Sequence, residues 1–249
     1  MAKLPIIDHK IGGLVIFVDA RSVSVVAAHY DDEVFMCGGL LSALAKRHYD
    51  LQVYLYFICR PRLASGDLAT DKELKTYQDD QLRAARILGI KNINQFTFLF
   101  DLEDENIDER ELTRLLPGQI TDHSDLVITH AMGDLNRDHE AVSRAVAVST
   151  RPYKDGSPKV ILGGFVPGST LSATQPDILV RVDDPSMFAK ANAVAAYKCQ
   201  IQETLITEKH PRSDKGVYRY AQSFTASWHG VGVYAEPFTF LHKPLLLDV

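Results

Sequence analysis

The stretch VSVVAAHYDDEVFMCGG, residues 23–39, joins an apolar run to a histidine and three consecutive acidic residues. The run before the histidine is rich in valine and alanine and predicts a buried β-strand. The residues after the acids carry apolar side chains at helical spacing and predict a helix. The junction thus concentrates four polar side chains, where like charges repel and desolvation costs free energy. These side chains are His29, Asp31, Asp32 and Glu33.

The rest of the chain continues this alternation of strand and helix. Strands are expected at 50–60, 93–100, 125–130, 159–165 and 177–182, and helices at 71–89, 108–120, 138–151 and 184–200. Several of these strands are apolar almost throughout, which is typical of a parallel sheet covered on both faces. The sequence therefore predicts an α/β fold, a Rossmann-like, doubly wound, mostly parallel sheet, in a single domain over residues 1–249. After residue 216 it predicts only a loop and a final strand at 232–242.

Composition excludes several classes of protein. The net charge of −5 and the absence of a long basic run argue against nucleic acid as a partner. Cys37, Cys59 and Cys199 are scattered without a CxxC pair, which argues against a disulfide framework and a thiolate zinc site. The N-terminus is too polar for a signal peptide, and no apolar run is long enough to span a bilayer. We expect a cytoplasmic protein; self-association is left open.

A second strand end supplies the rest of the candidate site. The strand that ends at His130 is followed by the polar loop AMGDLNRDHE, which runs into a helix. Ligands of open α/β sheets bind beyond the carboxyl ends of the strands, so the two loops are expected to meet. A divalent cation would neutralise the carboxylates there. We expect His29, Asp32 and His139 as its ligands, because two histidines and one carboxylate leave a position for water, as in catalytic zinc sites.

Two further carboxylates suit the chemistry of such a site. Zinc lowers the pKa of bound water to about 7, and a carboxylate that does not bind the metal can take the proton. Asp31, beside the expected ligand Asp32, is the candidate general base. Asp138 precedes His139 and can orient a histidine through a hydrogen bond. Fe²⁺ or another divalent transition metal suits the same ligands.

Two motifs carry a resemblance to a known family. The segments AHYDDE (28–33) and DLNRDHEAV (134–142) resemble the motifs of the PIG-L/LmbE-like family of metal-dependent N-deacetylases. The resemblance implies a Rossmann-like fold, zinc, and hydrolysis of an N-acetyl group on a glucosamine-type sugar. It places the family's metal ligands on His29, Asp32 and His139, and its general base on Asp31.

The sequence departs from the family pattern at five positions. Tyr30 replaces a usual proline, and Tyr197 replaces a usual histidine. Asn136 stands where some members carry a histidine that stabilises the oxyanion or donates a proton; asparagine can donate a hydrogen bond but cannot act as an acid. Tyr77 and Asp80 fall in the register of an R-x-x-E pair that contacts sugar in some relatives. The substrate is therefore expected to differ from theirs.

Four residues are candidates for substrate contact: Arg60, Tyr77, His130 and His229. Arg60 belongs to a basic rim that suits a phosphate group, although ordinary solvated surface charge explains it slightly better. His130 follows its strand directly, and a role in fixing the loop is favoured over metal binding. His229 lies in a glycine-rich loop that could reach a substrate.

The function expected is hydrolysis of an N-acyl group, most often acetyl, on a small amino sugar or glycoconjugate. The alternative is a non-catalytic module that binds a metal or a nucleotide sugar on the same fold. A magnesium pocket for phosphoryl transfer is disfavoured, because it needs oxygen ligands and not two histidines. Capping of a helix by acidic residues explains one or two carboxylates, but not the histidine or the matching second loop.

Overall fold

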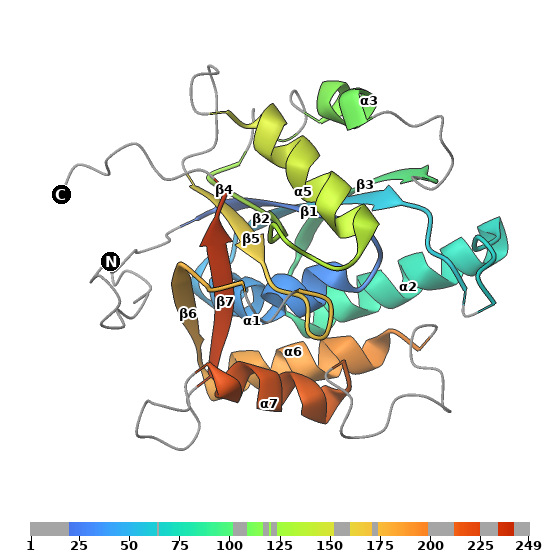
Figure 1. Ribbon diagram of the computed structural model, residues 1–249. Helices are drawn as coiled ribbons and strands as arrows, with labels where there is room; N and C mark the ends of the chain where they lie inside the picture. The colour runs from blue at the N-terminus through green and yellow to red at the C-terminus, as the bar shows by residue number, and fades with distance from the viewer. Residues whose placement is uncertain are drawn as a thin grey trace.

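A seven-stranded sheet lies between two layers of helices in the computed structural model (Figure 1). The structure describes residues 20–63, 65–101, 109–116, 120, 124–151, 160–170, 174–198, 212–224 and 234–241. The strands are β1 (Ser22–Ala27), β2 (Gln52–Cys59), β3 (Asn92–Phe100), β4 (Leu126–His130), β5 (Val160–Gly164), β6 (Ile178–Val182) and β7 (Tyr234–Phe240). Their order is β3-β2-β1-β4-β5-β7-β6, and all neighbours are parallel except at β7, which is antiparallel to both β5 and β6.

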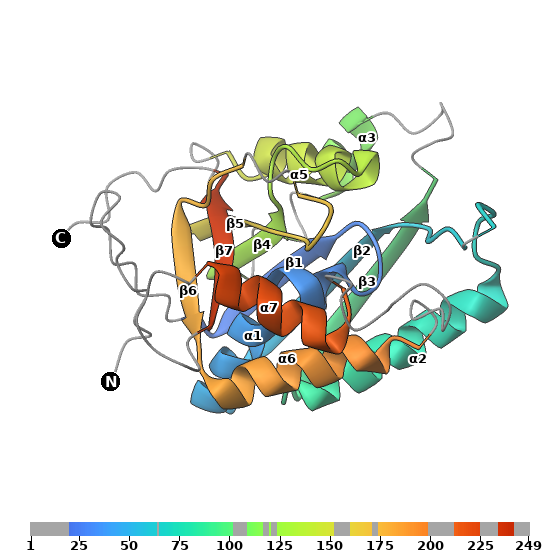
Figure 2. The same cartoon turned by 60° about the horizontal axis from the view of Figure 1, so that its bottom comes forward.

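Helices cover both faces of this sheet, as the sequence predicts. They are α1 (Asp32–Arg47), α2 (Asp71–Ile87), α3 (Glu109–Leu115), α5 (Arg137–Ser149), α6 (Asp184–Ala196) and α7 (Asp214–Ser223). Figures 1 and 2 show α1, α2, α6 and α7 on one face, and α3 and α5 on the other. The predicted Rossmann-like, mostly parallel α/β fold is confirmed.

The central strand β1 packs into both layers because its side chains alternate between the two faces. Val23, Val25 and Ala27 join the larger core, beneath α1, α2 and α6. Val26, and Ala28 directly after the strand, join the smaller core, against α5. All five side chains are buried, which explains why this strand is apolar on both sides and not alternating.

The C-terminal region differs from the sequence-based expectation. Helix α7 occupies part of the segment expected to be a loop. The Ser213 side chain caps it by accepting a hydrogen bond from the Gly216 backbone N–H, and Val217 and Ala221 are buried. A glycine inside a short polar segment disfavours a helix by local propensity, so tertiary packing of these apolar residues decides the outcome.

The order of the strands determines where the site lies. The chain passes from β1 to β2 on one side, whereas β4 and β5 lie on the other side of β1. The loops after β1 and β4 therefore leave the sheet next to each other, at the switch point where ligands bind in open α/β sheets. In the described segments, no helix has the length and apolar character needed to cross a membrane. The single domain over residues 1–249 and the cytoplasmic location stay predictions.

Candidate metal centre and catalytic site

The turn between β1 and α1 has an unusual backbone at Asp31. This residue precedes α1 with φ 93° and ψ −30°, in the left-handed region that non-glycine residues rarely adopt. The Glu33 carboxylate accepts a hydrogen bond from the Asp31 backbone N–H at 3.0 Å. The Tyr197 hydroxyl in turn donates to the other oxygen of Glu33. These contacts hold the turn in a conformation that costs about 1–3 kcal/mol on its own.

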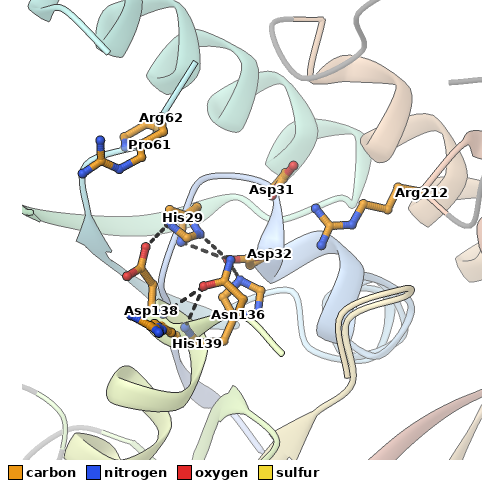
Figure 3. A pocket seen from close by; sticks show the side chains of 10 residues that line it. His29, Asp31, Asp32, Pro61, Arg62, Asn136, Asp138, His139 and Arg212 are labelled. Carbon is orange, nitrogen blue, oxygen red and sulfur yellow. Dashed lines mark hydrogen bonds and ion pairs between the residues drawn. The ribbon is translucent and has the colours of Figure 1, made fainter. Parts of the chain in front are cut away.

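The three expected metal ligands lie together. One ligand atom each of His29, Asp32 and His139 lies within 4.8 Å of the other two. Asp32 Oδ2 is 3.5 Å from His29 Nδ1 and 3.2 Å from His139 Nε2 (Figure 3). Two nitrogen donors and one carboxylate oxygen, drawn from both loops, could hold one divalent cation.

The other nitrogen of each histidine faces a second carboxylate. His29 Nε2 lies 2.9 Å from Asp138 Oδ2, and His139 Nδ1 lies 3.2 Å from Asp134 Oδ1. Histidines that bind metals are usually oriented by such an outer hydrogen bond. Asp138 thus takes the place expected of an orienting carboxylate. The contact of Asp134 with His139 is not predicted by the sequence, because an aspartate in a short polar loop is typical of a turn.

Asn136 shapes the second loop. Its side-chain oxygen caps α5 by accepting hydrogen bonds from the backbone N–H groups of Asp138 at 2.9 Å and His139 at 3.4 Å. Asp134 Oδ1 accepts from the Asn136 backbone N–H at 2.9 Å. Asn136 therefore holds Asp138 and His139 at the start of the helix.

Neighbouring charges shift the pKa values of the buried groups in this cluster. Burial favours neutral rings, but the neighbouring carboxylates outweigh it and raise the pKa of His29 to about 10 and that of His139 to about 9. Burial alone would raise the pKa of Asp32, yet His139 and His130 hold it well below its usual value. Burial and the neighbouring Asp32 charge raise the pKa of Asp31 well above its usual value. The cluster thus favours positive charge at its centre.

His130 lies beneath this cluster and is fully buried. Its Nε2 accepts a hydrogen bond from the Ala28 backbone N–H at 2.9 Å. Its ring stacks on that of His139, with centroids 3.9 Å apart. It links the ends of β1 and β4, which agrees with a role in fixing the loop and keeps it out of contact with the cavity.

A cavity of about 380 Å³ opens over the cluster, within the usual range for small-molecule sites. Its lining comes from the loops after β1, β2 and β4, from the first turns of α1 and α5, and from a residue just before α7: His29, Asp31, Asp32, Pro61, Arg62, Asn136, Arg137, Asp138, His139 and Arg212. Figure 3 shows Arg62 and Arg212 on opposite sides of the ligand residues. Arg212 Nε donates to the Pro167 carbonyl at 3.2 Å.

Other predicted substrate contacts lie outside this lining. Arg60 Nε donates to the Ala69 carbonyl at 2.8 Å, and its guanidinium pairs with Asp71. Tyr77 is buried in the core, where its ring stacks on Tyr30 with centroids 5.9 Å apart. Neither side chain reaches the cavity, because each is engaged by its own local packing. His229 lies outside the described residues.

Solved structures with the same fold are numerous. The N,N′-diacetylchitobiose deacetylase from Pyrococcus horikoshii has 17% identity and a TM-score of 0.65, over 91% of this chain and 85% of that chain. The 4-carboxy-2-hydroxymuconate hydratase from Pseudomonas putida KT2440 has 19% identity and a TM-score of 0.64, over 92% of this chain and 99% of that chain. Teicoplanin deacetylase Orf2 in its zinc-inhibited form has 17% identity and a TM-score of 0.62, over 88% of this chain and 98% of that chain. Similarity at this level shows a shared fold.

The family of the chain is shown by comparing its sequence with models of protein families. A search of the curated proteins gives no match. The family model described as PIG-L, GlcNAc-PI de-N-acetylase, matches residues 24–149. This match covers just over half of the chain and contains both the AHYDDE and the DLNRDHEAV segments. The chain therefore belongs to the PIG-L family.

Proposed function

We propose that this protein is a zinc-dependent hydrolase that removes an N-acyl group, in the first place acetyl, from an amino sugar or its conjugate. One observation carries the proposal. His29, Asp32 and His139 bring three ligand-type atoms together, and Asp31, a carboxylate outside that set, lines the same cavity. Metal-assisted hydrolysis of an amide uses a set of metal ligands next to a carboxylate that does not bind the metal.

The donor set fits zinc. Imidazole nitrogen and carboxylate oxygen are usual zinc ligands, and both histidines have the outer carboxylate that orients such ligands. When bound by His29, Asp32 and His139, zinc would polarise the acyl carbonyl and lower the pKa of water to about 7. Fe²⁺ or another divalent transition metal fits the same donors.

The chain's own residues then account for the proton transfers. The Asp31 carboxylate accepts the proton of the water whose oxygen attacks the acyl carbon. The raised pKa of Asp31, which results from burial and the Asp32 charge, suits it to return that proton to the amine nitrogen as the C–N bond breaks. The products are a carboxylic acid, acetic acid in the first case, and a free amine.

Two further residues support this reaction. Asn136 lines the cavity and offers an amide N–H to the oxyanion, but it cannot supply a proton. Asp138 holds His29 in the orientation that a ligand needs. Proton donation by Asp31 itself therefore replaces the acid that a histidine provides in some relatives.

The substrate class follows from the family and from the neighbours. The family model is that of a GlcNAc-PI de-N-acetylase, and two neighbours are named as deacetylases of diacetylchitobiose and teicoplanin. An amino sugar, free or conjugated, is the substrate that these names share. The hydratase among the neighbours has the same fold with another reaction, so the fold alone does not establish hydrolysis and the released products must be measured.

The test combines metal analysis with product release. The full chain is loaded with zinc and incubated with a panel of N-acetylated amino sugars and conjugates, and acetate and free amine are measured together. We expect both products in equal amounts, and loss of turnover in Asp31→Asn with zinc retained. Zinc binding without acetate from any member of the panel would support the alternative, a non-catalytic module that binds a metal or a nucleotide sugar.

A further inference from the structure

A second group of metal-ligand side chains adjoins the first. It consists of His29, Cys59 and Asp138, and one ligand atom of each lies within 4.8 Å of the other two. Cys59 ends β2 and is buried, and its backbone N–H donates to the Ala28 carbonyl at 2.8 Å. The parallel pairing of β1 with β2 thus brings a thiol to the strand end that carries His29.

We propose that His29, Cys59 and Asp138, together called the Cys59 site, bind a second zinc ion that inhibits the enzyme. Thiol sulfur, imidazole nitrogen and carboxylate oxygen are the three donor types that protein zinc sites use. The thiol makes the site unsuitable for magnesium or calcium, which take oxygen ligands. Three protein ligands leave a fourth position that water can fill from the cavity, which His29 and Asp138 both line.

His29 belongs to both groups through its two nitrogens. Nδ1 faces Asp32 at 3.5 Å, whereas Nε2 faces Asp138 at 2.9 Å. Zinc in the Cys59 site replaces the hydrogen bond between His29 Nε2 and Asp138, and it displaces one proton from Nε2 and one from the Cys59 thiol to solvent. Because this site needs the second ring proton of His29 and the thiol proton of Cys59 to be removed, it fills after the first.

Inhibition follows from the same geometry and rests on the proposed hydrolase function. Asp138 can no longer orient His29 when its carboxylate binds zinc, and loss of such an outer partner costs about 10- to 100-fold in activity. The ion also occupies the wall of the cavity that His29 and Asp138 form. Zinc beyond one equivalent should therefore lower turnover, whereas the first equivalent supports it.

The test measures zinc binding separately from activity. The full chain is titrated with zinc, desalted, and analysed for bound metal. We expect two equivalents in the wild type and one in both Cys59→Ala and Cys59→Val, the second of which keeps most of the side-chain volume. In a parallel titration with Co²⁺, a thiolate-to-cobalt absorption band should appear with the second equivalent and be lost in both Cys59 variants.

Matched controls come from the other two cysteines. Cys37 is also buried, but it donates to the Glu33 carbonyl at 3.2 Å and is not part of this group. Cys37→Ala and Cys199→Ala should keep two equivalents and the cobalt band. Turnover in excess zinc, relative to that at one equivalent of the same variant, should fall about 10- to 100-fold in the wild type and stay level in the Cys59 variants.

Several results would overturn the Cys59 site. A single equivalent of zinc in the wild type, no cobalt band, or a band that survives Cys59→Ala would each do so. Equal inhibition of wild type and Cys59→Ala by excess zinc would also exclude it as the inhibitory site. Failure of the proposed hydrolase function gives a different result. No acetate is then released at any zinc concentration, but two equivalents of zinc and the cobalt band are still observed.

Discussion

The strongest single test of the proposed catalytic geometry is Tyr197→Phe, which removes one buried hydroxyl far from Asp31 in sequence. Tyr197 donates to Glu33, and Glu33 accepts from the Asp31 backbone N–H at 3.0 Å. The change leaves one oxygen of a buried carboxylate without this donor, which costs about 1–3 kcal/mol of folding free energy. For a chain of this size each kcal/mol lowers the melting temperature by about 2–4 °C.

The effect on turnover follows from the backbone of Asp31. Its left-handed conformation costs about 1–3 kcal/mol unless the surroundings hold it. If Glu33 shifts, the catalytic conformation loses population by up to that free energy, which corresponds to a decrease in kcat of about 5- to 150-fold. KM should change little, because neither Tyr197 nor Glu33 lines the cavity.

Steady-state kinetics and thermal unfolding of the zinc-loaded protein measure both effects. Tyr56→Phe is the matched control, because it also removes a buried hydroxyl that bonds to a side chain, that of Ser24, in the other core. It should lower the melting temperature without lowering kcat. Wild-type kcat in Tyr197→Phe, or an equal loss of kcat in the two variants, would refute the idea that Tyr197 positions Asp31.

Four further predictions concern the proposed centre itself. Asp31→Asn should keep zinc, measured by elemental analysis, and lose turnover by about 10²- to 10⁴-fold, since the general base is gone; wild-type rates would remove Asp31 from the mechanism. His139→Ala should lose both zinc and activity, and full zinc occupancy would contradict its assignment as a ligand. Asp134→Asn should weaken zinc binding by about 10- to 100-fold in a competition titration with a chelating dye, because His139 loses its orienting carboxylate; unchanged affinity would show that the contact does not orient the ring. Removal of zinc with a chelator should lower the melting temperature, because a ligand that binds only the folded state stabilises it, and an unchanged midpoint would argue against a folded-state metal site.

Much of the fold could be predicted from local pattern. The apolar runs of β1, β2 and β4 and the amphipathic helices after them identify the parallel α/β core. Helix α7 could not be predicted, because its segment is short, polar and contains Gly216. The place of β7, antiparallel between β5 and β6, depends on pairing across the whole sheet.

The candidate site also has one part that the sequence predicts and another that depends on the folded structure. Residue type and position at strand ends predict that His29, Asp32 and His139 form a set, because the carboxyl ends of parallel strands share one edge. The approach of their second partners, Asp138 and Asp134, depends on the turn that caps α5. The orientation of the two histidine rings cannot be predicted from the spacing of residues in the sequence.

The sequence by itself determined which chemistry is present: the alternating elements, the two acidic and histidine-bearing loops, and the family to which they belong. Only the tertiary structure decided how these groups are placed. It set the left-handed turn at Asp31, the pairing of each histidine with its outer carboxylate, and the meeting of Cys59 with His29. The physical reason is that periodicity and residue type act over a few neighbours, whereas each of these contacts joins segments that only the folded sheet brings together, His29 and Asp138 being 109 residues apart.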